Sequence, residues 1–355
     1  MSQAAAQAYL NTRVSVMSTR LFRPSELAEL AGLGLDDLAA RFGLASLIDE
    51  HVTVRAKSRA VEQALISLLL AELAILVRPM TAAERALIMA WARKYALFNL
   101  KTLIRGKLYD LDQQEIRQNL YDLPPHVRLP HQELFRAENV LELLRQLEQG
   151  PHVLIARQAR EAYEQRREPF ALEAAIDQRY YAGLARQVRQ FHDASLQPLQ
   201  HLVGTLLDRE DVQCLMRFRF SYRLSPSETF YQLVPSFRLL HRDRLLELVE
   251  LETFEQVIEA LPAPLDALLA GASNLIEIQQ RLHHYMADEA RRVLALSASA
   301  VARALAYLIL RESQFRALFA LVQGHLLQLP TQLVGVAVGL AEPVCPLAPM
   351  TAKAA

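Results

Sequence analysis

The stretch WARKYALFNLKTLIRGK at residues 91–107 decides the fold of this chain, because weaker copies of it occur twice more. The second copy is VGTLLDREDVQCLMRFR at residues 203–219, and the third and faintest is LILRESQFRALFALVQG at residues 308–324. Each copy follows an amphipathic stretch that carries an acidic or amide residue three positions before an apolar one. Recurrence of a helical unit along a chain is typical of proteins built from similar modules. The sequence therefore predicts three related helical modules.

The residues that follow the first two copies strengthen this interpretation. Asp112-Gln-Gln-Glu115 and Ser225-Pro-Ser-Glu228 come at nearly the same distance after their copies. Both have the form of a capping box, in which a side-chain oxygen and a Glu satisfy the free amides at a helix start. Pro330-Thr331 has no such Glu after it. The third module is therefore predicted to be degenerate.

Composition and periodicity predict an all-α fold. Leu, Ala, Arg, Glu and Gln dominate and favour helices, and apolar residues recur at helical spacing along most of the chain. Each module is predicted to contain one long pair of helices, over residues 61–107, 171–220 and 276–327. The predicted domains are repeat 1 at 1–125, repeat 2 at 126–238, repeat 3 at 239–330 and a C-terminal tail at 331–355.

Charge, cysteine content and hydropathy exclude several classes of protein. The 355 residues carry 39 basic and 39 acidic side chains, and this balance argues against a general nucleic-acid binder. Cys214 and Cys345 lie far apart, so we expect neither a metal-binding cysteine pair nor a disulfide framework, and a reducing compartment is the default. We expect no secretory signal. The most apolar stretch, residues 64–77, contains Glu72 and is too short to span a membrane.

No catalytic or cofactor motif is present, and we expect no cofactor, no bound metal and no small-molecule substrate. Phosphate loops, dinucleotide-binding glycine patterns, His-Glu-x-x-His and Gly-x-Ser-x-Gly are all absent from the sequence. Polar side chains instead recur at corresponding places on the long helices. The candidate site residues are Asn99, Lys101, Arg105, Arg217 and Arg316. They either form solvated helix faces or converge around one axis, where they could grip a rod-like or ring-like partner.

The same residues resemble a known family. Residues 9–21 (YLNTRVSVMSTRL), 98–107 (FNLKTLIRGK) and 177–180 (DQRY), with Arg311-Glu312, Arg316 and Gly324, occur in the order seen in the rotor-capping subunit of V-type ATPases and ATP synthases. In the bacterial and archaeal complexes this is the C subunit, and in the eukaryotic ones it is the d subunit. The resemblance covers about residues 9 to 330. It implies an all-α, funnel-shaped body of three pseudo-symmetric domains.

The resemblance also implies a function. Such a subunit is non-catalytic and couples the central-stalk subunits to the membrane proteolipid ring in proton or sodium transport. It would lie peripherally on the cytoplasmic side of the membrane. The five candidate residues would then line or buttress the socket that receives the stalk. The chain departs from the family pattern at REDVQC, residues 209–214, where an acidic-then-Asn-Leu-Lys run is expected.

Two other functions remain open on the residues alone. One is an unrelated helical-repeat scaffold for protein interactions, and the other is an all-α enzyme whose site residues meet only in three dimensions. The candidate charges could also form helix-to-helix salt bridges inside the body instead of a socket.

Overall fold

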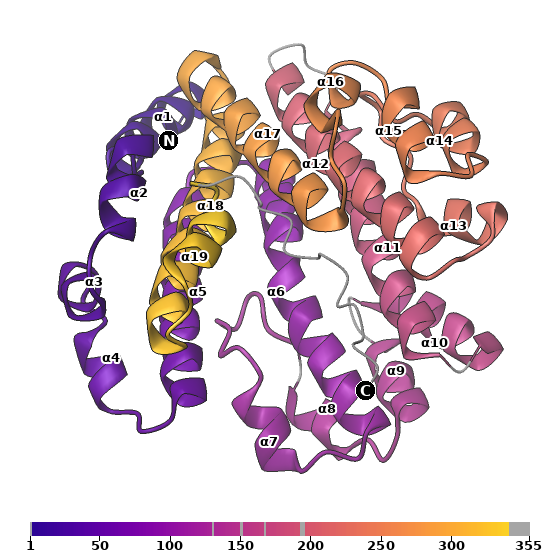
Figure 1. The fold of residues 1–355 in the computed structure, drawn as a ribbon, viewed down its shortest axis with the longest axis horizontal. Coiled ribbons are helices and arrows are strands. Elements are labelled where there is room, and N and C mark those ends of the chain that lie inside the picture. Colours follow the sequence, from indigo (N-terminus) through magenta and orange to yellow (C-terminus); the bar gives the residue numbers. More distant parts are fainter. Residues whose placement is uncertain (1, 130, 150–151, 167, 192–195, 341–355) are drawn as a thin grey trace, which may run out of the picture. The chain divides into compact units, whose positions relative to one another are not determined.

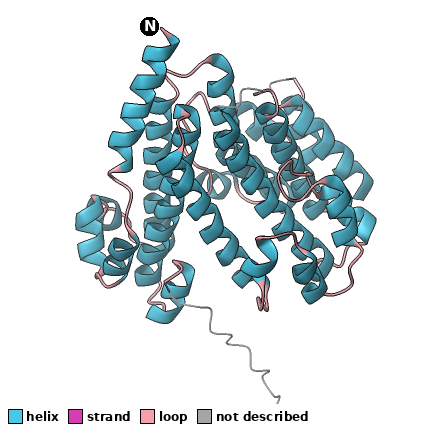
Figure 2. Ribbon diagram, turned by 90° about the horizontal axis from the view of Figure 1, so that it is seen from above, coloured by secondary structure: helices cyan, strands magenta, loops and turns pink. Residues whose placement is uncertain are grey.

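Every regular element of the described residues is a helix, which confirms the predicted all-α class (Figure 2). The computed structural model describes residues 2–129, 131–149, 152–166, 168–191 and 196–340. It forms two compact units, of which the first is Met1–Arg20 with Gln63–Arg311 and the second is Leu21–Glu62 with Glu312–Ala355. The three repeats at 1–125, 126–238 and 239–330 stay a prediction. Residues 341–355 of the predicted tail lie outside the described residues.

The first unit holds most of the helices (Figure 1). They are α1 (Gln3–Ser18), α6 (Ala82–Leu108), α7 (Gln113–Gln118), α8 (His131–Arg136), α9 (Val140–Leu147), α10 (Val153–Arg166), α11 (Pro169–Val188), α12 (Gln197–Met216), the π-helix η2 (Arg217–Ser221), α13 (Pro226–Gln232), α14 (Arg242–Val249), α15 (Phe254–Ala260), α16 (Leu265–Leu269) and α17 (Leu275–Leu296).

The second unit contains short helices. They are α2 (Pro24–Ala31), α3 (Leu35–Phe42), α4 (Ala45–Asp49) and α19 (Thr331–Ala337). Two long helices, α5 (Val54–Leu76) and α18 (Ala300–Leu326), contribute residues to both units. The predicted long pairs correspond to α5 with α6, α11 with α12, and α17 with α18.

Capping side chains begin several helices, including the two predicted at Asp112 and Ser225. Thr81 and Glu84 form a reciprocal capping box at the start of α6, and Ser225 and Glu228 form one at the start of α13. Asp112 begins α7, where its carboxylate accepts from the amides of the second and third helical residues. Each such bond satisfies a backbone donor that has no partner within the helix.

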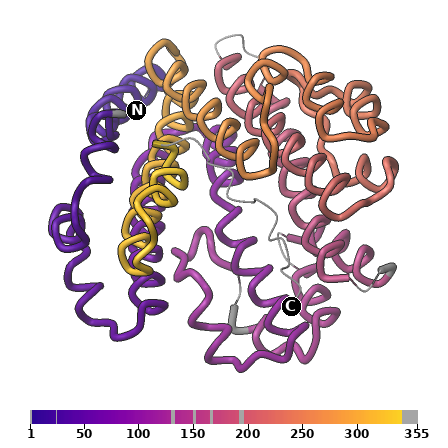
Figure 3. Tube along the Cα trace, in the orientation of Figure 1, coloured from indigo at the N-terminus to yellow at the C-terminus, as the bar shows by residue number. Residues whose placement is uncertain are grey.

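The long helices of the first unit pack in chain order. Helix α6 packs on α11, α11 on α12, and α12 on α17. Figure 3 shows the trace leaving α12 through the short helices of residues 226–269 and returning beside it as α17. Between α6 and α11, the Tyr180 hydroxyl donates to the Trp91 carbonyl oxygen at 2.9 Å, although the two residues are 89 positions apart. Successive predicted modules therefore contact each other through their long helices.

A buried ionic cluster joins the last long helix to the first. Glu72 of α5 is 3% exposed, and Arg311 of α18 is 8% exposed. The Tyr307 hydroxyl donates to Glu72 Oε2 at 2.7 Å, and Arg311 Nη2 donates to Glu72 Oε1 at 3.3 Å. Arg20, which follows α1, contributes its carbonyl oxygen to Arg311 and places its guanidinium 3.9 Å from the Glu72 carboxylate. This cluster therefore connects α18, α5 and the end of α1 within the first unit.

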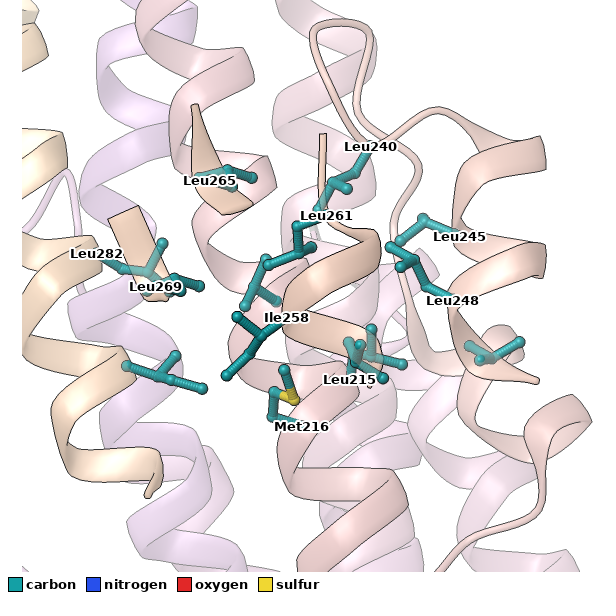
Figure 4. Packing of buried hydrophobic residues seen from close by; sticks show 14 of the residues in the cluster. Leu215, Met216, Leu240, Leu245, Leu248, Ile258, Leu261, Leu265, Leu269 and Leu282 are labelled. Carbon is teal, nitrogen blue, oxygen red and sulfur yellow. The ribbon is translucent and has the colours of Figure 1, made fainter. Parts of the chain in front are cut away.

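The short helices α14 to α16 are held by a leucine-rich core (Figure 4). Leu248, Ile258, Leu265 and Leu269 are almost fully buried against α12 and α17, where Leu215 is also buried. Fully burying one such side chain contributes about 1.5–3 kcal/mol. Helices of five to eight residues are too short to persist alone in water, so this core holds them in place.

Helix α10 is an element that the sequence reasoning missed. Its residues are strongly polar on average, which resembles a loop. In the structure Ala156 and Ala159 are fully buried, and α10 packs closely on α9 and α11. His152 precedes it, and burial, together with the charge of Arg93, lowers the pKa of this imidazole to about 4. A narrow alanine face is enough for burial, because small side chains let helices approach closely.

Glycine spacing matters at one helix contact. A Cβ built on Gly106 of α6 would lie 2.4 Å from Cδ1 of Ile116 in α7. Real Cβ atoms do not come this close, and Ile116 is itself buried. Gly106 therefore lets α7 pack directly on α6. By contrast, a Cβ built on Gly183 of α11 would meet no neighbouring side chain of the described residues within 4 Å.

Candidate functional site

Two charged rows face each other where α6 packs on α11. Lys101 and Arg105 lie one turn apart on α6, and Glu173 and Asp177 lie one turn apart on α11. Lys101 Nζ donates to the two Asp177 oxygens at 2.7 and 2.9 Å. Arg105 Nε and Nη2 donate to the two Glu173 oxygens at 2.5 and 2.6 Å. We call these four residues the α6–α11 ladder.

The ladder is ordered but contributes modestly to stability. The Arg105 side chain is 54% exposed, and that of Asp177 is 44% exposed. Exposed ion pairs are typically worth about 0–1 kcal/mol each, although a two-pronged Arg–carboxylate pair is among the stronger kinds. The hydrogen bonds that Arg105 donates to Glu173 raise the pKa of the guanidinium further, so it stays charged. The main effect of the ladder is to set the register of α6 on α11.

Asn99 lies on a different face of α6 and is fully buried. Its Nδ2 donates to the carbonyl oxygen of Tyr121 at 2.8 Å, and its Oδ1 accepts from the Tyr121 amide at 2.8 Å. The side chain thereby pairs both polar groups of one backbone residue in the loop after α7. In this position Asn99 can buttress a surface but cannot line it.

A pocket of about 350 Å³ opens beside the ladder, between α6, α11, α12, η2 and α13. Its wall combines charged, apolar and aromatic side chains. They are Arg105, Phe170, Glu173, Ala174, Asp177, Gln178, Tyr181, Leu207, Glu210, Asp211, Cys214, Arg217, Phe218, Tyr222, Gln232 and Val234. The volume falls at the lower end of the range typical of small-ligand sites.

Asp211 is the most unusual group on this wall. It is 3% exposed, and its Oδ1 accepts from the Val234 amide at 2.9 Å. Its Oδ2 is buried and has no hydrogen-bond partner within the described part of the chain. Burial raises the pKa of this carboxyl well above its usual value, and the nearby charges of Asp208 and Glu210 add to the effect, while the Val234 amide opposes it. A carboxyl without a counter-ion in such a place takes up a proton.

The neighbouring titratable groups are held neutral in the same way. Burial raises the pKa of the Cys214 thiol, so this cysteine has none of the thiolate character that a reactive cysteine needs. Burial also raises the pKa of Tyr181 well above its usual value. Among the residues that the structure describes, no three His, Cys, Asp or Glu side chains lie close enough together to hold a metal ion.

An aromatic group forms one side of the pocket. The rings of Phe170 and Tyr222 have centroids 4.3 Å apart, and those of Phe170 and Phe218 are 5.3 Å apart in an edge-on arrangement. Tyr222 is half exposed, at the end of η2. The widened π-turn at residues 217–221 carries Phe218 toward Phe170 while leaving Arg217 exposed. Single π-turns of this kind are frequent at functional sites.

The structure brings three of the five predicted site residues together. Lys101 and Arg105 belong to the α6–α11 ladder, and Arg105 and Arg217 both line the pocket. Asn99 lies away from them inside the body, and Arg316 is exposed on α18 in the second unit. Their assignment to a stalk socket stays a prediction.

Sequence reasoning missed the acidic half of the ladder. Glu173 was not singled out, and Asp177 appeared only as the first residue of the DQRY segment at 177–180. The available signal was spacing: carboxylates four residues apart on α11 match cations four residues apart on α6, and residues at this spacing share one helix face. Nothing in the sequence says which helix faces which.

Fold and site together define a class: an all-α protein of packed long helices whose polar side chains join one helix to the next. Comparison with known families then identifies the family within this class. The family described as ATP synthase (C/AC39) subunit matches residues 10–335, and the chain belongs to this family.

Two curated relatives agree with this assignment, and both are named as the C subunit of an A-type ATP synthase. The chain is 26% identical over 218 residues to the protein of Methanocaldococcus jannaschii, and the match covers 60% of this chain and 54% of the relative. It is 25% identical over 228 residues to the protein of Methanosarcina mazei, covering 62% of this chain and 61% of the relative. The matched part thus spans less than two thirds of either relative. None of the helices in the described residues is long and apolar enough to cross a membrane.

Proposed function

We propose that this chain is a non-catalytic coupling subunit of a rotary V-type ATPase or ATP synthase. It would link the central-stalk subunits to the membrane proteolipid ring during proton or sodium transport. The observation that carries the proposal is the family match over residues 10–335. The protein would lie peripherally on the cytoplasmic side of the membrane as part of the complex.

The architecture of the first unit supports a mechanical role. Long helices pack in sequence from α6 to α17, and the buried Glu72–Arg311 pair joins α18 to α5. Interiors packed to crystal-like density have low compressibility and transmit strain. A body of this kind can carry torque between two partners without chemistry of its own.

Co-purification from native membranes tests the proposal. The tagged chain, expressed at its natural level, should recover a proteolipid and the catalytic ATPase subunits after mild detergent extraction. A tagged protein of similar size with no membrane partner is the control. Recovery of the chain without any ATPase subunit would refute the proposal.

The role of the charged residues needs a second experiment. Reversing Lys101, Arg105 and Arg217 together to Glu should weaken stalk binding more than about tenfold, or roughly 1.4 kcal/mol. The structure adds a complication, because the first two reversals also place like charges across the α6–α11 ladder. Loss of binding in this variant alone could therefore reflect a damaged interface.

A charge swap separates the two explanations. The variant Lys101→Glu, Asp177→Lys, Arg105→Glu, Glu173→Arg reverses both rows and keeps every opposite-charge pair. If the α6 cations contact the stalk, the swap restores thermal stability but leaves binding weak. If it restores both stability and binding, these residues only join helices and the socket assignment fails.

A further inference from the structure

The pocket beside the α6–α11 ladder contains one carboxyl group for which the described residues supply no counter-ion. The other three carboxylates on its wall each have a cation. Glu173 pairs with Arg105, Asp177 with Lys101, and Glu210 with Arg209. Asp211 Oδ2 has no hydrogen-bond partner among the residues that the structure describes. Its neighbour Asp208 is also buried, but accepts from the Leu239 and Leu240 amides and from Arg238.

An unpaired buried carboxyl oxygen is costly. Leaving a buried acceptor without a partner costs about 1–3 kcal/mol, and more if the group is charged. The Val234 amide accounts for one oxygen of Asp211 and leaves the other without a donor. Asp211 is also one of the residues that line the pocket, so a donor bound there would satisfy this buried oxygen.

The surroundings select a cation. Besides Asp211, the charged side chains on the wall are Glu173, Asp177, Glu210, Arg105 and Arg217. Arg105 is neutralised by Glu173, and Arg217 is exposed to water, where its repulsion is screened. The charges that act on Asp211 are those of Asp208 and Glu210, and both would repel an anion. Tyr181 and Cys214 are neutral and add no charge.

The surroundings also indicate the shape of that cation. A metal ion is disfavoured, because no three His, Cys, Asp or Glu of the described chain come together. The Phe170, Phe218 and Tyr222 rings offer apolar and π surface beside the carboxyl group. Aromatic faces attract ammonium and guanidinium groups, and they pack well against methylene chains.

We propose that this pocket binds a primary ammonium or guanidinium group carried on an aliphatic chain, with the cation on Asp211 Oδ2 and the chain against the Phe170–Tyr222 rings. A volume of about 350 Å³ accommodates a lysine or arginine side chain or a short diamine. The cation has two possible sources. One is a free diamine, and the other is a basic side chain of a partner protein in the complex, which rests on the proposed function.

Binding is coupled to proton release. Burial keeps the Asp211 carboxyl protonated in the free protein, and an arriving cation favours its ionised form. The proton leaves to the buffer as the cation binds. Affinity therefore rises with pH, up to the pKa that the carboxyl has in the empty pocket.

Calorimetric titration of the full-length protein with putrescine tests the proposal. Binding should be detectable, with a Kd of about 1 mM or tighter, and should release a proton, which appears as a dependence of the heat on the buffer used. The diol with the same carbon chain should not bind. Undetectable putrescine binding, or an affinity that does not change with pH, would overturn the proposal.

Two variants locate the contact. Asp211→Asn keeps the acceptor for the Val234 amide and removes the charge, so putrescine affinity should fall at least about tenfold and proton release should disappear. Glu210→Gln is the matched control on the same wall, where affinity should change by less than about threefold. Equal losses in the two variants, at unchanged thermal midpoints, would contradict the assignment to Asp211. If Asp211→Asn does not fold, the pH dependence of the unmodified protein decides the question.

The source of the cation is decided in the assembled complex. If a partner's basic side chain fills the pocket, putrescine binds the isolated chain and not the complex. If the ligand is a free diamine, both bind it. Failure of every putrescine experiment would leave the co-purification result unaffected, so the two proposals can fail separately.

Discussion

Glu72 provides the sharpest test of how the first unit is held together. This carboxylate accepts from the Tyr307 hydroxyl at 2.7 Å and from Arg311 Nε and Nη2 at 3.3 Å each. Burial and the hydrogen bond to Glu72 raise the pKa of Tyr307, so the phenol stays a neutral donor. The perturbation is Glu72→Gln, which keeps size and shape but removes the negative charge.

The expected cost is set by the partner that remains. Arg311 is 8% exposed and would lose the carboxylate with which it pairs. Removing one member of a buried ion pair typically costs about 3–5 kcal/mol. Arg311 also donates to the Arg20 carbonyl oxygen, and in the variant this hydrogen bond still replaces part of the hydration that the buried guanidinium lacks. We therefore expect Glu72→Gln to lower the free energy of unfolding by about 3 kcal/mol, at the lower end of that range.

A double-mutant cycle identifies the cause. Arg311→Met alone should cost about as much, because it leaves the buried Glu72 carboxylate with only the Tyr307 hydroxyl and the largely exposed Arg20 guanidinium. The double variant should cost no more than either single change, since no buried charge remains, and the coupling energy should be about 2–3 kcal/mol. Glu247→Gln is the control, because it breaks an exposed pair with Arg244 and should cost less than about 0.5 kcal/mol.

Urea unfolding followed by tryptophan fluorescence is the appropriate assay. The chain has one tryptophan, and Trp91 is buried in α6 of the first unit, so its signal reports on that unit. Additive effects of the two single changes, within about 0.5 kcal/mol, would refute the view that Glu72 and Arg311 act as a pair.

Three further predictions test individual contacts. Asn99→Asp should destabilise the protein by about 2–3 kcal/mol in urea unfolding, because it loses the donor to the buried Tyr121 carbonyl oxygen and sets two acceptors against each other; an unchanged midpoint would contradict this. Gly106→Ala should lower the free energy of unfolding by about 1–2 kcal/mol, since overpacking outweighs the gain in helix propensity. Gly183→Ala has space for the new methyl group and should raise the free energy of unfolding by up to about 1 kcal/mol. Equal shifts in the two thermal midpoints would be inconsistent with this packing. His152 has a folded pKa of about 4 against 6.5 for an unfolded histidine, so the unfolded state binds more protons between these values and stability falls as pH falls through that window. His152→Gln should flatten the dependence of stability on pH from about 6.5 to 4 and leave it unchanged above about pH 7.5; an identical slope in both proteins would rule out this contribution.

Local features of the fold could be predicted because their causes are local. The capping sequences at Thr81 and Ser225 satisfy amides within one turn of themselves, so the starts of α6 and α13 follow from a few residues. The long helices follow from periodicity in the same way. Helix α10 was missed because its signal is a pair of buried alanines, Ala156 and Ala159, and alanine occurs as readily on exposed helix faces.

The candidate site was only partly predictable for a different reason. Lys101, Arg105 and Arg217 could be recognised as recurring cations on helices. Their partners depend on how α6, α11 and η2 pack, and that packing is decided by apolar surfaces far from the charges themselves. Asp211 was visible in the sequence as a polar residue, but its lack of a counter-ion could not be, since burial is a property of the assembled helices.

The sequence by itself determined the all-α class, the helical pairs at residues 61–107, 171–220 and 276–327, and the family. These depend on short-range spacing, which survives in the order of the residues. Tertiary structure alone decided that Asn99 holds the Tyr121 backbone and that Glu72 meets Arg311 across 239 positions of sequence. It alone also decided that Asp211 lines a pocket with one oxygen that no described residue satisfies. Long-range contacts of this kind form only where several helices bury their apolar faces together, and many sequences with the same periodicity could satisfy that requirement in different registers.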